Sequence, residues 1–231
     1  MAACDTRAQC GGLDRLRPPK GGRSAFRPYP LDVAEPQIRL ADQVANGTMS
    51  AEIAALLRET AQAHESFLVM AVPRLAGKTT TMRAMLAEQT RPVLALGYDG
   101  DDVDALAARA RGGYLFVPEI SRGAWSAGYV WGEPVRRAFG AITQGTALAT
   151  ALHAPDPAEA FAIICGGCGV PDAHAARLSL VVYLRSLGEW EQPTRRVVST
   201  VHRIHAVRDG VPDAELLFRW DEKTDTFERA G

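Results

Sequence analysis

A short apolar segment, Phe67–Val72, leads into Gly77-Lys78-Thr79-Thr80 and then into a sequence with helical spacing. An apolar segment of this length is typical of a strand buried on both faces of a parallel sheet. Strand, turn and helix in this order form the first half of a β-α-β unit. The free amides at a helix N-terminus form a pocket for an anion. The segment therefore predicts a phosphate-binding loop within an α/β sheet.

Each residue type in this loop has a physical reason to bind a nucleotide. Gly77 lets the backbone approach a phosphate, the Lys78 ammonium can reach the β- and γ-phosphates, and the Thr79 hydroxyl can bind Mg²⁺. The expected nucleotide-binding residues are Ala76, Gly77, Lys78, Thr79 and Thr80. The full motif has glycine where this chain has Val72, so the loop has less freedom to adopt left-handed angles. The alternative is a lysine at a helix start whose charge is simply solvated.

The rest of the chain predicts a three-layer α/β fold. Further strands are expected at 92–98, 114–120 and 146–154, and helices at 51–64, 78–89, 102–111, 133–143 and 157–165. The last third contains consecutive strands at 178–187, 195–207 and 214–221, separated by turns at Gly188, Gly210 and Pro212. We therefore expect a mostly parallel sheet extended by antiparallel C-terminal strands.

The composition predicts one folded domain preceded by an arm. Residues 1–36 are rich in glycine, proline and basic residues and predict a flexible arm, whereas 37–231 predict a single domain. Apolar residues make up 47%, and the net charge is −1, which gives no support for nucleic-acid binding. No stretch approaches the roughly 18–20 apolar residues that cross a bilayer, and the N-terminus lacks the apolar core of a secretory signal. We therefore expect a cytoplasmic protein with no membrane span.

Two further residues follow predicted strands and point to chemistry at the same sheet edge. Glu119 follows the apolar segment "YLFVP", as the carboxylate of a Walker B segment does. Ligands in such sheets bind at the carboxyl ends of the strands, where this acid could hold the water shell of a metal or orient an attacking water. His153 ends the strand at 146–154 and could contact the γ-phosphate or its water. The alternatives are an ordinary acid at a strand end and a core histidine with a satisfied ring.

Two other sequence features leave alternatives open. Cys165 and Cys168 form a C-x-x-C sequence, which is either a metal or redox pair or two reduced thiols in a glycine-rich loop after a helix. Residues 124–132 resemble an insertion that holds Trp125 and Trp131. These aromatic side chains form an exposed contact patch or are buried in the monomer.

The order of these motifs resembles the type II/type IV secretion and pilus assembly ATPase family. "AGKTTTMRAML" is similar to its Walker A segment and following helix, "YLFVPEI" to its Walker B segment, and "QGTALATALHAPDPAEAF" to its His box. The resemblance extends from about residue 38 to the C-terminus and covers only the C-terminal motor domain, without the usual N-terminal domain. It implies a RecA-like P-loop domain that binds ATP and Mg²⁺, with Glu119 and His153 as catalytic residues.

The resemblance also implies partners and a location. Members form hexameric rings and act with an inner-membrane platform protein, so a homo- or hetero-oligomeric ring is expected in the cytoplasm or at the inner face of the cell membrane. The implied function is a slowly hydrolysing motor-type subunit of a type II/IV secretion or type IV/tight-adherence pilus system. The alternative is a catalytically degenerate nucleotide-binding or purely structural partner of such a ring.

Departures from the family pattern favour slow turnover or the degenerate alternative. Pro118 occupies the place of a glycine, and Lys78 and Glu119 are only 41 positions apart, which shortens the acidic Asp-box region. The candidate Asp-box acids are Asp99, Asp101 and Asp102, and the candidate arginine fingers are Arg109 and Arg111.

Overall fold

The computed structural model describes residues 38–72, 75–97, 102–123, 128–189 and 192–231, so the predicted arm at 1–36 lies outside the described residues. The helices are α1 (Leu40–Ala45), α2 (Ala51–Gln62), α3 (Lys78–Leu86), α4 (Val103–Arg109), α5 (Glu133–Ile142), α6 (Pro157–Phe161) and α7 (Asp172–Ala175). The strands are β1 (Ser66–Ala71), β2 (Val93–Ala95), β3 (Tyr114–Ile120), β4 (Tyr129–Val130), β5 (Ala147–Leu152), β6 (Leu178–Glu189), β7 (Gln192–Arg208), β8 (Val211–Asp221) and β9 (Thr226–Arg229).

One sheet runs through the described molecule in the order β2-β3-β5-β1-β6-β7-β8-β9, and β4 pairs with β3. β1 is parallel to both β5 and β6, and β3 is parallel to β2, β4 and β5. The pairings from β6 through β9 are antiparallel. The predicted three-layer α/β class, with a mostly parallel sheet and antiparallel C-terminal strands, is confirmed.

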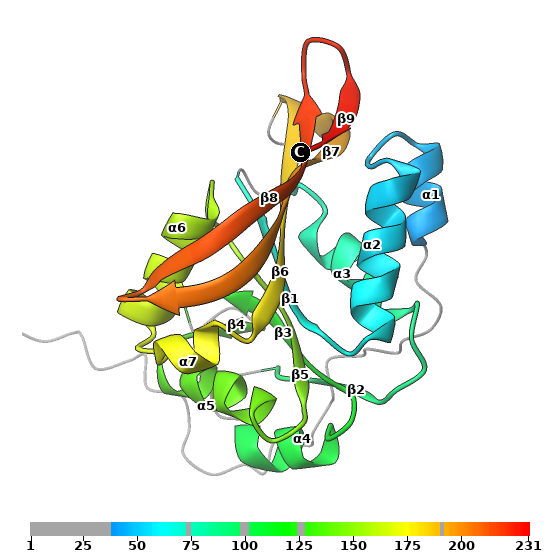
Figure 1. Cartoon of the computed structure of the whole chain (residues 1–231). Helices are drawn as coiled ribbons and strands as arrows, with labels where there is room; N and C mark the ends of the chain where they lie inside the picture. Colours follow the sequence, from blue (N-terminus) through cyan, green and yellow to red (C-terminus); the bar gives the residue numbers. More distant parts are fainter. Residues whose placement is uncertain (1–37, 73–74, 98–101, 124–127, 190–191) are drawn as a thin grey trace, which may run out of the picture.

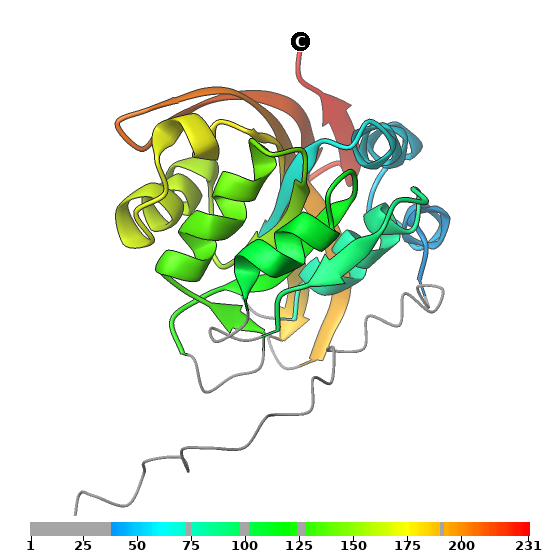
Figure 2. The same cartoon turned by 90° about the horizontal axis from the view of Figure 1, so that it is seen from below.

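Alternation along the strands divides the core into two layers. Phe67 and Val69 of β1 pack in one cluster with α1, α2 and α3, whereas Leu68 and Met70 pack in the other with α4 to α7. Figure 1 shows the first three helices on one side of the sheet and α5, α6 and α7 on the other, and Figure 2 shows the same layers from below. Both faces of the central strands are therefore covered, as their apolar sequence predicts.

Capping and periodicity explain why α2 forms where the sequence predicts a helix. The Ser50 hydroxyl accepts a hydrogen bond from the Ile53 amide at 3.2 Å, which satisfies one free donor of the first turn. Ile53, Leu57 and Ala61 are spaced by four residues and are fully buried. The helix ends at Gln62, two residues before the predicted end.

The C-terminal strands are longer than predicted, and two of the three expected turns are wrong. Gly210 lies in the turn between β7 and β8 with φ of 74°. Gly188, however, lies inside β6 with φ of 89°. The pairing of β6 with β7 shifts register between Leu187 and Gly188. A glycine bulge lets a strand continue through such a position. Pro212 is the second residue of β8 and not a turn residue, since proline is tolerated near the start of a strand.

The helix predicted at 157–165 changes its hydrogen-bonding pattern part of the way along. α6 ends at Phe161, and Ala162–Gly167 form a π-helix, with the Cys168 amide donating to the Ile163 carbonyl at 2.9 Å. Cys165, at the end of the predicted helix, therefore lies in this π-helix. Burial raises the pKa of the Cys165 thiol to about 11. In the part of the chain that the structure describes, no group of three or more His, Cys, Asp or Glu side chains is placed to hold a metal ion.

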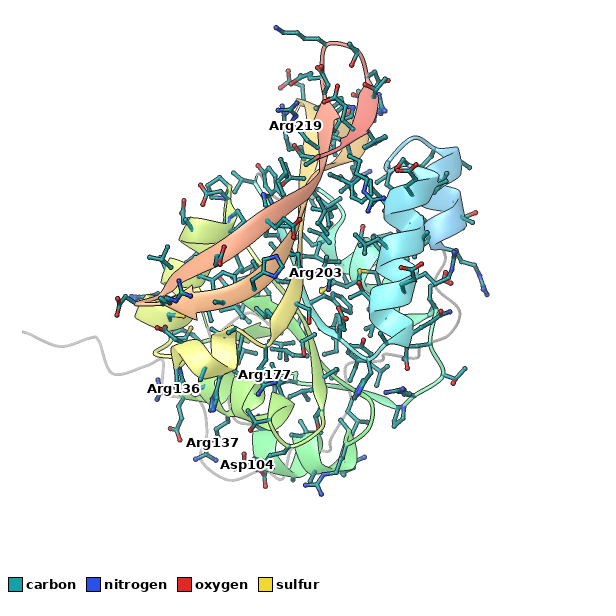
Figure 3. The ribbon with its side chains drawn as sticks, viewed as in Figure 1. Asp104, Arg136, Arg137, Arg177, Arg203 and Arg219 are labelled. Carbon is teal, nitrogen blue, oxygen red and sulfur yellow. The ribbon has the colours of Figure 1, made fainter. Side chains whose placement is uncertain are left out.

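The remaining surface features are local. Trp131 is partly buried against the core cluster on the side of the sheet covered by α5. The Arg122 guanidinium lies 4.7 Å from the centroid of its ring. Trp125 lies outside the described residues. Arg137 of α5 bridges to Asp104 of α4 at 3.1 Å (Figure 3). None of the described helices is both long and apolar enough to cross a membrane.

Candidate phosphate-binding site

The connection from β1 to α3 begins at the carboxyl end of the strand, and its residues 73 and 74 lie outside the described residues. β1 ends at Ala71 and α3 begins at Lys78, with Gly77 in the left-handed conformation at φ of 92°. Leu75 is also left-handed, at φ of 65°, which costs about 1–2 kcal/mol in a residue with a Cβ. Val72, which stands where the full motif has glycine, is not among the residues with positive φ. Among the described residues of this connection, the left-handed ones are therefore Leu75 and Gly77.

An irregularity in β3 turns the predicted acid toward the loop. Leu115 and Val117 face the α5 side, and strict alternation would place Glu119 on the same side. Instead Ile120 packs on the α5 side, because the pairing of β3 with β5 shifts register between Val117 and Ile120. Pro118 lies at this shift and has no amide hydrogen to give to the ladder. Glu119 is therefore turned to the α3 side of the sheet.

The structure brings three predicted side chains into contact. The Lys78 ammonium lies 3.4 Å from Glu119 Oε2 and 3.0 Å from His153 Nε2. His153 Nε2 in turn lies 3.6 Å from Glu119 Oε1. The side chains of Lys78 and Glu119 are only 9% and 12% exposed, so the ion pair is shielded from water and keeps more of its strength than a surface pair. Lys78, Glu119 and His153 thus form one compact charged cluster.

The hydrogen bonds around His153 fix the role of each ring nitrogen. Nδ1 lies 2.9 Å from the Ala71 carbonyl oxygen, which can only accept, so Nδ1 carries the proton. In the neutral ring Nε2 is then an acceptor, and the Lys78 ammonium donates to it. His153 is therefore tied both to the end of β1 and to the lysine of the loop.

A cavity of about 640 Å³ opens beside this cluster. Its walls are the phosphate loop with the first turn of α3, the end of α1 with the loop after it, and the beginning of β7. All five residues predicted to bind the nucleotide line it, together with Glu119. Thr79 and Thr80 are exposed residues of the cavity wall. The volume falls in the range of about 300–1,000 Å³ that is usual for small-molecule sites.

The candidates Asp102, Arg109 and Arg111 do not line the cavity. Asp102 caps α4 by accepting a hydrogen bond from the Ala105 amide at 3.0 Å, and Asp99 and Asp101 lie outside the described residues. Arg109 and Arg111 precede β3 in the chain, whereas Glu119 lies near its carboxyl end.

Part of the cavity wall comes from residues that no sequence motif predicts as site residues. Gln43 and Thr48 come from α1 and the loop after it, and Arg195 and Arg196 from β7. Arg196 Nε donates to the Leu75 carbonyl at 2.8 Å, and Arg195 donates to the Gly47 carbonyl at 3.0 Å. No local pattern marks such residues, because β7 reaches the loop only through the folded sheet.

No protein-family model and no curated protein matches this chain. Two similar solved structures are ATPases. The VirB11 ATPase from the Brucella suis type IV secretion system, in complex with sulphate, is 15% identical over 71% of this chain and 56% of its own, with a TM-score of 0.46. The Legionella pneumophila ATPase DotB is 16% identical over 74% of this chain and 50% of its own, with a TM-score of 0.46. The chain spans about half the length of these structures.

Proposed function

We propose that this chain binds ATP with Mg²⁺ at the loop 76–80 and hydrolyses it slowly, as a motor-type subunit of a type II/IV secretion or type IV/tight-adherence pilus system. The observation that carries the proposal is the convergence of Lys78, Glu119 and His153, within 3.0–3.6 Å of one another, beside a cavity lined by a helix N-terminus. A buried lysine and a buried carboxylate at the open end of a phosphate loop suit nucleotide hydrolysis.

The charged cluster has a clear part to play in such a reaction. The Lys78 ammonium is compensated by Glu119, and phosphate oxygens at the loop would compete for the same ammonium. Glu119 Oε1 is buried and accepts no hydrogen bond from the described residues, so it can accept one from a water. Glu119 would then orient that water, while His153 Nε2, which contacts the same ammonium, would respond to the loss of the γ-phosphate.

The residues present fit a magnesium ion bound with the nucleotide. Mg²⁺ usually takes one or two protein oxygen ligands and completes its shell with phosphate oxygens and waters. The hydroxyl of the exposed residue Thr79 is such a ligand, and Glu119 is the nearby carboxylate that would hold the water shell. When bound, the ion would neutralise charge on the phosphates.

The wider assignment follows from the resemblance of the motifs. We propose that the chain works in a homo- or hetero-oligomeric ring, expected to be a hexamer, beside an inner-membrane platform protein. Its place would be the cytoplasm or the inner face of the cell membrane. Under this proposal residues 37–231 form the motor-type domain.

The second candidate is a nucleotide-binding or structural partner that does not turn over. Two observations favour it: the Lys78 ammonium already has an acid partner at 3.4 Å, and the loop holds a left-handed leucine. Both features oppose rearrangement around a triphosphate. Nucleotide binding without hydrolysis would support this candidate over the first.

The test compares binding and turnover in three proteins: the wild type, Lys78→Met and Lys223→Met. Lys223 lies on the exposed turn after β8 and serves as the matched control. Mg-ATP at 100 times its dissociation constant should stabilise the wild type and the control by about 2.7 kcal/mol, seen as a rise in melting temperature. We expect Lys78→Met to lose that rise and any release of phosphate.

Two results would contradict the proposal. One is a folded wild type whose melting temperature does not respond to millimolar Mg-ATP. The other is a Lys78→Met protein that binds and hydrolyses ATP as the wild type does. Methionine keeps most of the aliphatic volume of lysine, so the variant tests the charge more than the packing. Its circular dichroism spectrum establishes that it folds.

A further inference from the structure

Gln43 is a buried polar residue of the cavity wall that the proposed chemistry does not use. It lies on α1, is only 3% exposed, and lines the cavity. Its Oε1 accepts a hydrogen bond from the hydroxyl of Thr81 at 2.9 Å. Its Nε2 is buried and has no hydrogen-bond partner among the residues that the structure describes.

The surroundings hold this amide in one place. The main-chain carbonyl oxygen of Gln43 accepts a hydrogen bond from the Thr48 amide at 2.8 Å. The main-chain carbonyl oxygen of Thr48 accepts one from the Val198 amide of β7 at 2.7 Å. Thr81, which is 2% exposed, lies in the first turn of α3. The main chain at Gln43 is thus linked to β7 through Thr48, and the bond from Thr81 holds Oε1 and leaves Nε2 as the end still able to donate.

A buried donor without a partner costs about 1–3 kcal/mol, so a protein tolerates one where a ligand can satisfy it. The Gln43 amide is neutral, so it adds no charge for holding phosphates, and it can donate to an acceptor atom of a nucleoside. Phosphates held by the loop amides and Lys78 would occupy one end of the cavity. The walls formed by α1, its following loop and β7 would then surround the nucleoside.

We infer that Gln43 is a specificity-determining residue whose Nε2 donates a hydrogen bond to an acceptor atom of the bound nucleoside. The acceptor is a ring nitrogen or carbonyl of the base, or a ribose oxygen. This inference rests on the proposed function, because it requires the phosphates to lie at the loop. It adds that the chain reads the nucleoside through a residue of α1, and so discriminates among ligands that share the same phosphates.

The decisive variant is Gln43→Glu, because a carboxylate still accepts the bond from Thr81 but has no hydrogen to donate. Gln43→Leu removes both bonds and serves as a second variant if the acid disturbs folding. Gln62→Glu is the matched control, since Gln62 is exposed on α2. Affinities for Mg-ATP, Mg-2′-deoxy-ATP and Mg-tripolyphosphate are measured by isothermal titration calorimetry on the full chain.

We expect Gln43→Leu to weaken Mg-ATP binding by about threefold to tenfold, the size of one lost hydrogen bond, and Gln43→Glu to weaken it at least as much because its carboxylate also repels the phosphates. Gln43→Leu leaves the charge of the site unchanged. In this variant the affinity for Mg-tripolyphosphate should stay within twofold of the wild-type value. If the acceptor is the ribose 2′-oxygen, the wild type binds 2′-deoxy-ATP as weakly as the Leu variant binds ATP. If the acceptor is on the base, the two nucleotides lose affinity equally in the variants.

The inference and the proposed function fail in different ways. Unchanged Mg-ATP affinity in both Gln43 variants would overturn the inference and leave the phosphate site intact. Equal losses for Mg-ATP and Mg-tripolyphosphate in Gln43→Leu would also overturn it, because they would show that Gln43 only supports the loop. Failure of the wild type to bind either ligand would overturn the proposed function itself.

Discussion

The two halves of the sheet differ in their burial and in what they give to the cavity. β1 and β5 have six residues each and are buried along their whole length. β7 has 17 residues, buried in the middle and exposed toward its ends. The parallel half places Lys78 and Glu119 at the cavity, with His153 in contact with both, whereas the antiparallel half supplies Arg195 and Arg196.

This difference separates chemistry from enclosure. Side chains at the carboxyl ends of short parallel strands meet at one edge because the strands point the same way. β7 runs in the opposite direction, and its residues at this edge form part of the cavity wall. Arg196 shows the relation directly, since it donates to the Leu75 carbonyl and so braces the loop that the parallel half presents.

The largest effect is expected in the parallel half, from Glu119→Gln. The amide keeps the shape of the side chain but cannot carry the negative charge that orients an attacking water. Phosphate release should fall by about 100-fold or more, while Mg-ATP binding is retained. Steady-state phosphate release and thermal shift on the same preparation measure the two quantities.

Glu52→Gln, on an exposed position of α2, is the control for this variant. It should keep the wild-type rate. A Glu119→Gln protein that hydrolyses ATP at the wild-type rate would show that the parallel half does not supply the water-orienting group. The parallel half would then contribute to phosphate binding but not to the orientation of the attacking water.

The parallel half could be predicted from sequence more fully than the antiparallel half. The segment "YLFVPEI" gives β3 its observed bounds, because an apolar run between polar turns is a local signal. The contact of Lys78 with Glu119 followed from the rule for strand ends. The register shift at Pro118 did not, since it depends on how β3 pairs with β5 and β4.

Residues that act across the fold gave no such signal. Gln43 stands on a six-residue helix with no motif around it, and its meaning depends on Thr81, 38 positions away. Arg196 reaches the Leu75 carbonyl across a separation of 121 positions. In both cases the sequence shows a polar residue on an ordinary element, and only the packing shows what that residue touches.

A smaller effect is expected from Gly77→Ala, at the contact between the two halves. Gly77 has φ of 92°, and a Cβ there would lie 3.1 Å from Arg196 Cδ. The left-handed angle costs about 1–2 kcal/mol, and the close contact adds to it. We expect the melting temperature to fall by about 2–8 °C, measured by differential scanning calorimetry.

Gly112→Ala is the matched control, because Gly112 also has positive φ but has nothing within 4 Å of a Cβ. The two variants share the backbone cost, so their difference isolates the contact with Arg196. Adding Arg196→Ala to Gly77→Ala should recover that difference. No recovery would mean that β7 does not press on the loop, which would weaken the division into chemistry and enclosure.

The smallest effect concerns the pH dependence of the antiparallel half. Burial lowers the pKa of His202 on β7, although the charge of Asp156 opposes the shift. Above the ordinary histidine pKa of about 6.5, both the folded and unfolded states are neutral at this residue and it adds no pH dependence. As the pH falls below that value, the unfolded state takes up the proton first, so the free energy of unfolding decreases. Melting temperatures at pH 8 and pH 5.5 measure the slope.

His202→Gln should flatten this slope, because glutamine does not titrate. His205→Gln is the control on the same strand, where the side chain is 53% exposed and pairs with Glu215 at 2.8 Å. The control should keep the contribution of His202. If His202→Gln leaves the slope unchanged, the acid sensitivity does not come from the partly buried imidazole of β7. The pH dependence of this half would then come from groups other than its partly buried histidine, and burial on β7 would have no measurable electrostatic consequence.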